Sequence, residues 1–125
     1  TPVADVLADP EQAAEFEAHL ANEFAMELLL FLRAVKQFKD DFRSLPAATR
    51  RTRAKKLCRT YISPTGLYAV NLPSHITRPL TQRVADANTR FDDPATANVF
   101  DDARDEVMRV LQGSYDRMVA RKLHS

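Results

Sequence analysis

An apolar stripe of helical spacing over residues 23–42 constrains the fold of this chain more than any other feature. Six apolar side chains follow one another at intervals of four, three, four, three and four residues: Phe24, Leu28, Phe31, Val35, Phe38 and Phe42. On a helix with about 3.6 residues per turn, these positions fall within one narrow face. We therefore expect a central core helix here, covered by other helices, with functional residues at its ends or flanks.

Helix-start signals and shorter apolar stripes predict helices on both sides of this segment. Asp9 before Pro10 is a helix start, because Asp can cap the first amides and Pro suits the first helical position. Residues 1–7 predict a short helical turn before it. After Pro46, apolar residues at helical spacing indicate a helix that ends at the breakers of residues 63–66.

The C-terminal half carries three further signals. Residues 66–72 indicate loop or extended chain, and the helix that follows should bend at Pro79. A last long stripe begins at Phe100. Gly113 is a natural stop for that helix, after which Ser114 can cap a final short one. The sum of these patterns predicts an all-α fold, a bundle of about nine helices.

Length and composition indicate one ordinary globular domain. A chain of 125 residues is long enough for a single core, and only two glycines argue against a fold rich in hairpins. We expect residues 1–125 to form a single domain. Because the chain begins without Met, we expect that it is excised from a longer protein. No apolar run approaches the ~20 residues of a membrane span.

Charge is unevenly distributed along the chain although the net charge is only +1, which gives no indication of nucleic-acid binding. Seven acids and no Lys or Arg precede Arg33, whereas residues 43–59 hold seven bases and no acid. A solvated helix face explains the basic segment, and so does a surface for anionic lipid or an acidic protein. The candidate residues of that surface, called here the basic face, are Arg50, Arg51, Lys55 and Arg59.

The side chains that carry catalysis or bind metals are sparse in this sequence. The three histidines are far apart and lie in no metal-ligand spacing with the acids or with Cys58. Cys58 lies on an apolar helix stripe, where a buried and inert thiol is the expected state. A single cysteine allows no internal disulfide and indicates a reducing compartment. We expect no catalytic residue, no metal, no cofactor and no active site.

Three segments together resemble one family, the regulators of G-protein signalling, or RGS domains. Residues 23–32, EFAMELLLFL, resemble the EFSEENxxFW motif at a helix start. Residues 54–72 contain AKK, YISP and VNL in the order of the family segment A…IYxxFI…VN(L/I). Residues 100–118, FDDARDEVMRVLQGSYDRM, resemble FDxAQxxIxxLMxxDSYxRFL. Order and spacing agree along nearly the whole chain, which is identified as a divergent member of the family.

The resemblance implies an RGS-like bundle of about nine helices and a GTPase-activating function. RGS domains bind the switch regions of an activated Gα subunit of a heterotrimeric G protein. Gα already supplies its catalytic arginine and a glutamine that orients the attacking water. A partner that binds best to the transition-state arrangement lowers the barrier and needs no reactive group of its own. The resemblance further implies a monomer in the cytoplasm, held at the inner face of the plasma membrane through flanking regions or partners.

The resemblance also implies which residues contact Gα. Asn71 matches the family asparagine that reaches beside the catalytic glutamine, where its amide can both donate and accept hydrogen bonds. Glu27 and Arg117 match an acid and a base at the contact. The remaining contact positions by alignment are Phe24, Ala25, Leu28, Gly113 and Ser114.

The sequence departs from the family at several of these positions. Ala25, Leu28 and Gly113 stand where the family has serine, asparagine and aspartate, and Leu32 replaces a tryptophan. Losing a buried polar contact to Gα typically costs ~1–3 kcal/mol of binding free energy. Leu28 could instead contribute an apolar contact to a divergent Gα. The alternative is therefore an RGS-fold adaptor without activator activity, which binds Gα, another protein or a membrane through the basic face.

Overall fold

A computed structural model describes residues 1–23 and 25–124, and the described residues are helical with connecting loops and no strand. The α-helices are α1 (Val3–Ala8), α2 (Pro10–Asn22), α3 (Met26–Asp41), α4 (Ala47–Leu57), α5 (Ser74–Ala85) and α6 (Asp101–Leu123). Two 3₁₀ turns, η1 (Phe42–Ser44) and η3 (Pro94–Asn98), and a π turn, η2 (Cys58–Ile62), accompany them. The all-α prediction is confirmed. The predicted number of about nine helices is wrong: the described part of the chain has six α-helices.

The predicted stripe forms the centre of the core, on α3 and its short continuation η1. Its described members, Leu28, Phe31, Val35, Phe38 and Phe42, are all buried. Phe24 lies outside the described residues. The ring of Phe100, at the start of α6, meets the Phe38 ring edge-on at a centroid distance of 5.5 Å. Edge-on contacts of this kind add specificity to the burial of apolar area.

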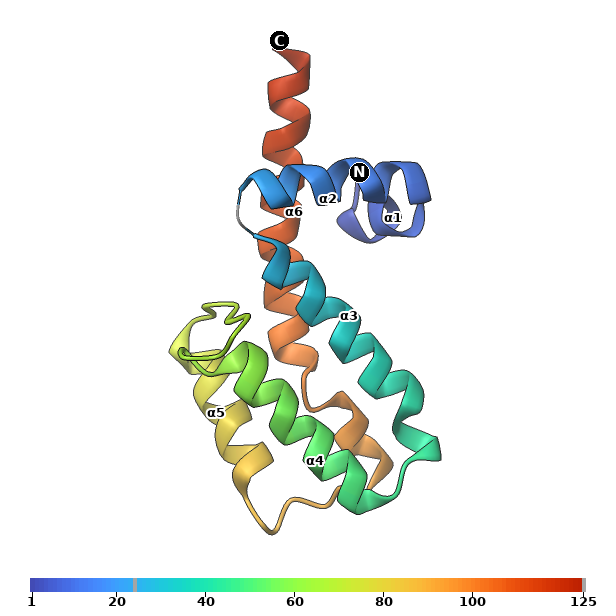
Figure 1. Ribbon diagram of the computed structural model, residues 1–125, viewed down its shortest axis with the longest axis vertical. Coiled ribbons are helices and arrows are strands. Elements are labelled where there is room, and N and C mark those ends of the chain that lie inside the picture. Colours follow the sequence, from blue (N-terminus) through green and yellow to red (C-terminus); the bar gives the residue numbers. More distant parts are fainter. Residues whose placement is uncertain (24, 125) are drawn as a thin grey trace.

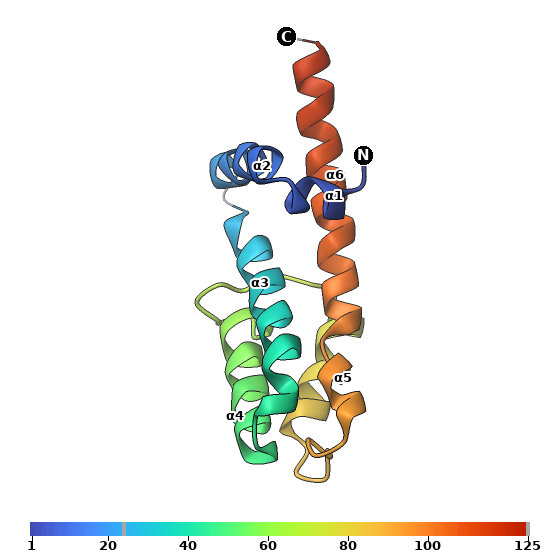
Figure 2. The ribbon, with the colours of Figure 1, turned by 90° about the vertical axis from the view of Figure 1, so that its right-hand side faces the viewer.

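Helices α3, α4, α5 and the first half of α6 form a bundle, and α6 continues beyond it (Figures 1 and 2). With 23 residues, α6 is about 35 Å long. Its second half carries α1 and α2, where the Val3 amide donates to Gln112 Oε1 at 2.7 Å. The two termini of the domain are thereby tied to one helix.

The predicted break at Gly113 is wrong. Gly113 and Ser114 lie inside α6, which has no second start there, and Gly113 does not have a positive φ. A glycine ends a helix only where the chain adopts the left-handed conformation. Here both neighbouring turns bury apolar side chains, Leu111 and Met118, and this packing outweighs the weak helix propensity of glycine.

The predicted starts and stops elsewhere are mostly confirmed. Asp9 accepts hydrogen bonds from the amides of Glu11 and Gln12 at the start of α2. Asp93 caps a 3₁₀ turn by accepting from the Ala95 amide at 2.9 Å. Helix α5 continues through Pro79, and the expected bend stays a prediction.

Two arginines of the basic face bind the backbone of neighbouring segments. Arg50 donates from Nε to the Phe42 carbonyl at 2.7 Å and from Nη1 to the Phe91 carbonyl at 2.9 Å. Its guanidinium also lies 4.0 Å from the centroid of the Phe42 ring. Arg51 donates to the carbonyls of Asp86 and Thr89. Both side chains therefore hold the chain between α5 and α6 against α4.

Candidate functional site

A π turn at the end of α4 determines where the loop of residues 63–73, the Asn71 loop, begins. In η2 the Ser63 amide donates to the Cys58 carbonyl at 2.8 Å, five residues back. Single π turns are frequent at functional sites, because they change the direction of the chain and its hydrogen bonding. Here the carbonyls of Thr60 and Tyr61 accept from the loop itself.

Backbone hydrogen bonds fasten the Asn71 loop to this turn. The Tyr68 amide donates to the Thr60 carbonyl at 3.0 Å, and the Val70 amide donates to the Tyr61 carbonyl at 2.9 Å. Gly66 packs so closely that a Cβ there would lie 2.5 Å from the carbonyl oxygens of Arg59 and Thr60. Only glycine allows the loop to approach the turn at this distance.

Aromatic contacts continue from the core to the outside of the same loop. The Tyr61 ring lies 5.5 Å from the Phe31 ring of α3, and the Tyr68 ring stacks on Tyr61 at 6.3 Å. Val70 is buried, whereas Leu67 at the loop tip is 80% exposed. The inner side of the loop is therefore packed against the core, and its outer side chains are exposed to solvent.

Asn71 is placed at the end of this fastened segment and is exposed. Its φ of +52° makes it the only non-glycine residue with a positive φ in the described ranges. Asparagine tolerates the left-handed conformation better than other residues with a side chain. The sequence prediction of an accessible loop asparagine agrees with this geometry. Its contact with a partner stays a prediction.

The second part of the candidate site is the connection between α2 and α3, called here the elbow, of which Glu23 and Ala25 are described. The Ala25 amide donates to the Leu20 carbonyl at 2.9 Å, so α3 starts directly after α2 ends. Ala25 makes no side-chain cap for α3. Glu27, in the first turn of α3, is partly exposed, as a contact residue requires.

The third part lies on α6 and ties to the elbow. Ser114 is only 4% exposed, and its hydroxyl donates to Glu23 Oε1 at 2.7 Å. His19 Nε2 lies 2.6 Å from the same oxygen. The Ser114 hydrogen bond, with smaller help from the nearby charges of His19, Arg117 and Arg121, lowers the pKa of the Glu23 carboxyl.

The remaining predicted contact residues differ in accessibility. Arg117 is exposed on α6 and Gly113 is half-buried. Leu28 is 7% exposed and belongs to the core, as Ser114 does to the α6 packing. Neither Leu28 nor Ser114 offers a free side chain to a partner in this conformation, and Phe24 lies outside the described residues. Their roles as contact residues stay predictions.

The elbow and the Asn71 loop lie on the same side of the molecule in two perpendicular views (Figures 1 and 2). The Asn71 loop lies at the end of α4, whereas the elbow lies further along α6, at the end of α2. The hydrogen bond from Ser114 to Glu23 joins two of the three segments that the sequence comparison singled out, the elbow and α6, across 91 residues of the chain. A common contact surface that includes the Asn71 loop stays a prediction.

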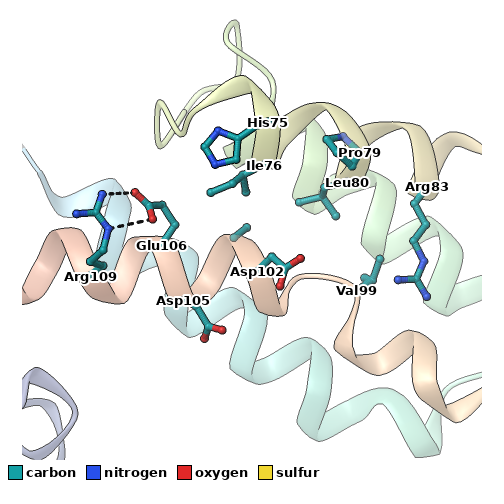
Figure 3. A pocket seen from close by; sticks show the side chains of 11 residues that line it. His75, Ile76, Pro79, Leu80, Arg83, Val99, Asp102, Asp105, Glu106 and Arg109 are labelled. Atoms are coloured by element: carbon teal, nitrogen blue, oxygen red, sulfur yellow. Dashed lines mark hydrogen bonds and ion pairs between the residues drawn. The ribbon is translucent and has the colours of Figure 1, made fainter.

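The sequence alone did not indicate Glu23, His19 or a groove between α5 and α6. The groove has a volume of about 540 Å³ and is lined by Ile76, Leu80 and charged side chains (Figure 3). Glu106 and Arg109 form a bidentate ion pair at one end of it. Apolar residues at helical spacing predict a buried helix face, and they do not show whether that face is fully covered or lines a groove. The sequence therefore did not indicate this groove.

Within residues 1–23 and 25–124, no three metal-binding side chains come together. Burial raises the pKa of the Cys58 thiol to about 12, so it is a poor nucleophile at neutral pH. Across the same residues, no helix is long and apolar enough to cross a membrane.

Comparison with known families agrees with the geometry. A comparison with curated protein sequences finds no match. The family model described as "Regulator of G protein signaling domain" matches residues 3–119, which is nearly the whole chain and includes the elbow, the Asn71 loop and most of α6. The chain therefore belongs to the family of regulator of G protein signaling domains.

Proposed function

We propose that this domain accelerates GTP hydrolysis by an activated Gα subunit and contributes no reactive group. Asn71 carries the proposal: it is an exposed amide in the left-handed conformation, next to a buried valine, on a loop fastened by backbone hydrogen bonds. Such a loop can present the amide with little loss of entropy on binding. The elbow and α6 supply the rest of the contact surface.

The mechanism follows from differential binding. The switch segments of Gα are mobile, and hydrolysis requires the glutamine and the attacking water to be held in line with the γ-phosphate. The Asn71 amide can donate to and accept from that glutamine and so restrict it. Contacts that form only in this arrangement lower the barrier, and equally strong binding of the ground state would not.

Single-turnover GTP hydrolysis by a panel of Gα subunits tests the proposal. The domain should raise the rate of at least one Gα, and Asn71→Ala should remove most of the gain. Asn71→Gly is the matched control for backbone strain. Glycine adopts a positive φ without cost but lacks the side-chain amide of asparagine. The glycine variant should lose activity as the alanine variant does. Full activity in Asn71→Gly, or no acceleration of any Gα, contradicts the proposal.

A second candidate function, an adaptor without activator activity, rests on Ala25, Leu28 and Gly113 at three contact positions and on two exposed bases. Lys55 and Arg59 are exposed on the α4 side, whereas Arg50 and Arg51 are occupied with backbone carbonyls. We propose that only the exposed bases would meet a membrane or an acidic partner. An adaptor of this kind would bind the GDP form of Gα as well as the GDP–aluminium fluoride form.

Charge reversal separates the two candidates. Lys55→Glu with Arg59→Glu should abolish binding to vesicles of phosphatidylserine and phosphatidylcholine if the basic face docks on membranes, and leave activation of Gα unchanged. Arg51→Glu is unsuitable for this test, because it would leave the carbonyls of Asp86 and Thr89 without their donor. No vesicle binding by the unmodified domain would contradict membrane docking.

A further inference from the structure

We propose that Glu23 is a positioning residue, whose carboxylate joins α2, the elbow and α6 and so fixes the start of α3 for binding of the partner. The inference rests on the proposed function for its effect on Gα, but its structural part is testable on the isolated domain. It concerns a residue that contributes no predicted contact itself.

The first observation is that two side chains converge on one oxygen of Glu23. Ser114 Oγ donates to Oε1 at 2.7 Å from α6, and His19 Nε2 lies 2.6 Å from the same atom on α2. Ser114 is buried and the side chain of His19 is 12% exposed, whereas that of Glu23 is 28% exposed. Of the two, only the buried Ser114 hydroxyl makes a hydrogen bond to the carboxylate, and His19 Nε2 acts through its proximity. A hydrogen bond from a buried donor to a charged acceptor is stronger than an exposed ion pair.

The charges around this carboxylate favour its ionised form. The Ser114 hydrogen bond is the largest cause of the lowered pKa of Glu23, and the positive side chains of Arg117 and Arg121 on α6 act in the same direction. The carboxylate therefore stays charged at neutral pH and keeps its attraction for α6. Arg117 is in turn one of the predicted partner contacts, so the carboxylate in the elbow acts on a predicted contact residue of α6 as well.

Besides this contact, the elbow is held by backbone hydrogen bonds and by Ala25, which packs against the core. Glu23 ends α2, where its amide donates to the carbonyls of His19 and Leu20, and Ala25 provides no side-chain cap for α3. A side-chain hydrogen bond, from Ser114 to Glu23, links the elbow to α6. Core packing sets the direction of α3 as a whole, and this contact holds the chain just before its first turn, which carries Glu27.

This arrangement gives Ser114 a different role from the predicted one. Its hydroxyl is used inside the domain, so its replacement would act on a partner through Glu23 and not through a lost direct contact. Two residues that act through one contact do not have additive effects when both are replaced. That non-additivity distinguishes a linked pair from two independent surface residues.

The experiment compares Glu23→Ala, Glu23→Gln, Ser114→Ala and the double variant Glu23→Ala/Ser114→Ala, with Glu11→Ala as a control carboxylate at the far end of α2. Affinity for Gα loaded with GDP and aluminium fluoride should fall about tenfold in Glu23→Ala. The single-turnover rate at saturating domain should not change, because Asn71 is intact. Glu23→Gln keeps an acceptor for Ser114 and should lose less than threefold. The double variant should be no weaker than Glu23→Ala.

Hydrogen–deuterium exchange of the domain alone provides the second measurement. Glu23→Ala should speed exchange at the first protected amides of the elbow and α3, Ala25 and Leu28, by about tenfold, and leave the Asn71 loop unchanged. Unchanged exchange at those amides, or additive losses in the double variant, overturns the inference. If exchange responds as expected and the unmodified domain activates no Gα, the positioning role stands and the proposed function fails.

Discussion

The Asn71 loop and the elbow are two edges of one candidate site, and they are held by different parts of the chain. The loop is fastened by backbone amides that donate to the carbonyls of a π turn. The elbow is linked to α6 by side chains, Ser114 and Glu23, with His19 beside them. A backbone-held segment tolerates most side-chain changes, whereas a side-chain-held segment responds to single substitutions and to protonation. Each of the predictions below acts on one edge and spares the other.

The largest expected effect concerns Cys58, in the π turn beneath the loop. At pH 8 a thiol of pKa about 12 should react with iodoacetamide roughly a thousandfold more slowly than an ordinary thiol. Alkylation followed by mass spectrometry, in buffer and in denaturant, measures this ratio. Rapid alkylation of the native domain would show that the turn and its loop open easily, which contradicts a firmly held edge.

One of the two glycines lies in the Asn71 loop and the other on α6, beside the serine that holds the elbow, and they should respond oppositely to alanine. Gly66→Ala places a Cβ 2.5 Å from two carbonyl oxygens and should cost about 2–3 kcal/mol of unfolding free energy, because the loop must shift. Urea denaturation measures the loss, and activation of Gα should fall with it. Unchanged stability would mean that the loop can detach from the turn at no cost.

Gly113→Ala is the counterpart on α6, next to the Ser114 that holds the elbow. A Cβ there meets nothing closer than Arg117 Nη1 at 3.5 Å, an ordinary contact. The substitution should raise the unfolding free energy by about 0.5–1 kcal/mol, because alanine favours the helical backbone. The same denaturation experiment measures it. A loss of stability would indicate that α6 needs a flexible point beside Ser114.

The smallest effect is the response of the elbow to acid. Because the pKa of Glu23 is lowered in the fold, its carboxylate contributes stability above the ordinary value of 4.5. That contribution should be lost as the pH falls below 4.5, through the folded pKa. The difference in unfolding free energy between the unmodified domain and Glu23→Gln should shrink over that range. A difference that stays constant with pH would contradict the role of the charge.

Much of the fold could be predicted from the sequence, since local patterns determine local elements. The stripe on α3 and the cap at Asp9 were predicted correctly because period and capping chemistry involve residues close in the chain. The break at Gly113 was wrong, because packing on both sides of a residue overrides its propensity and is not visible locally. The number of helices was overstated because single 3₁₀ and π turns carry the same start and stop signals as helices.

The residues predicted to contact a partner stay predictions, but the structure shows which of them are accessible. Asn71 and its exposure agree with the sequence-based interpretation, whereas Leu28 and Ser114 are buried. The functions of Arg50 and Arg51 were also unexpected. From the sequence alone, a basic residue on a helix is interpreted as a solvated charge. Arg50 and Arg51 instead bind backbone carbonyls about forty residues away, which no local pattern predicts.

The sequence by itself determined the helical class, the central stripe and the family, because these depend on residue types at fixed spacings. Only the tertiary structure decided which polar side chains meet. The hydroxyl of Ser114 binds a carboxylate 91 residues away, and the loop amides bind a π turn that no periodicity reveals. Hydrogen bonds between distant segments depend on angles and distances of a few tenths of an ångström, which become fixed only when the helices pack.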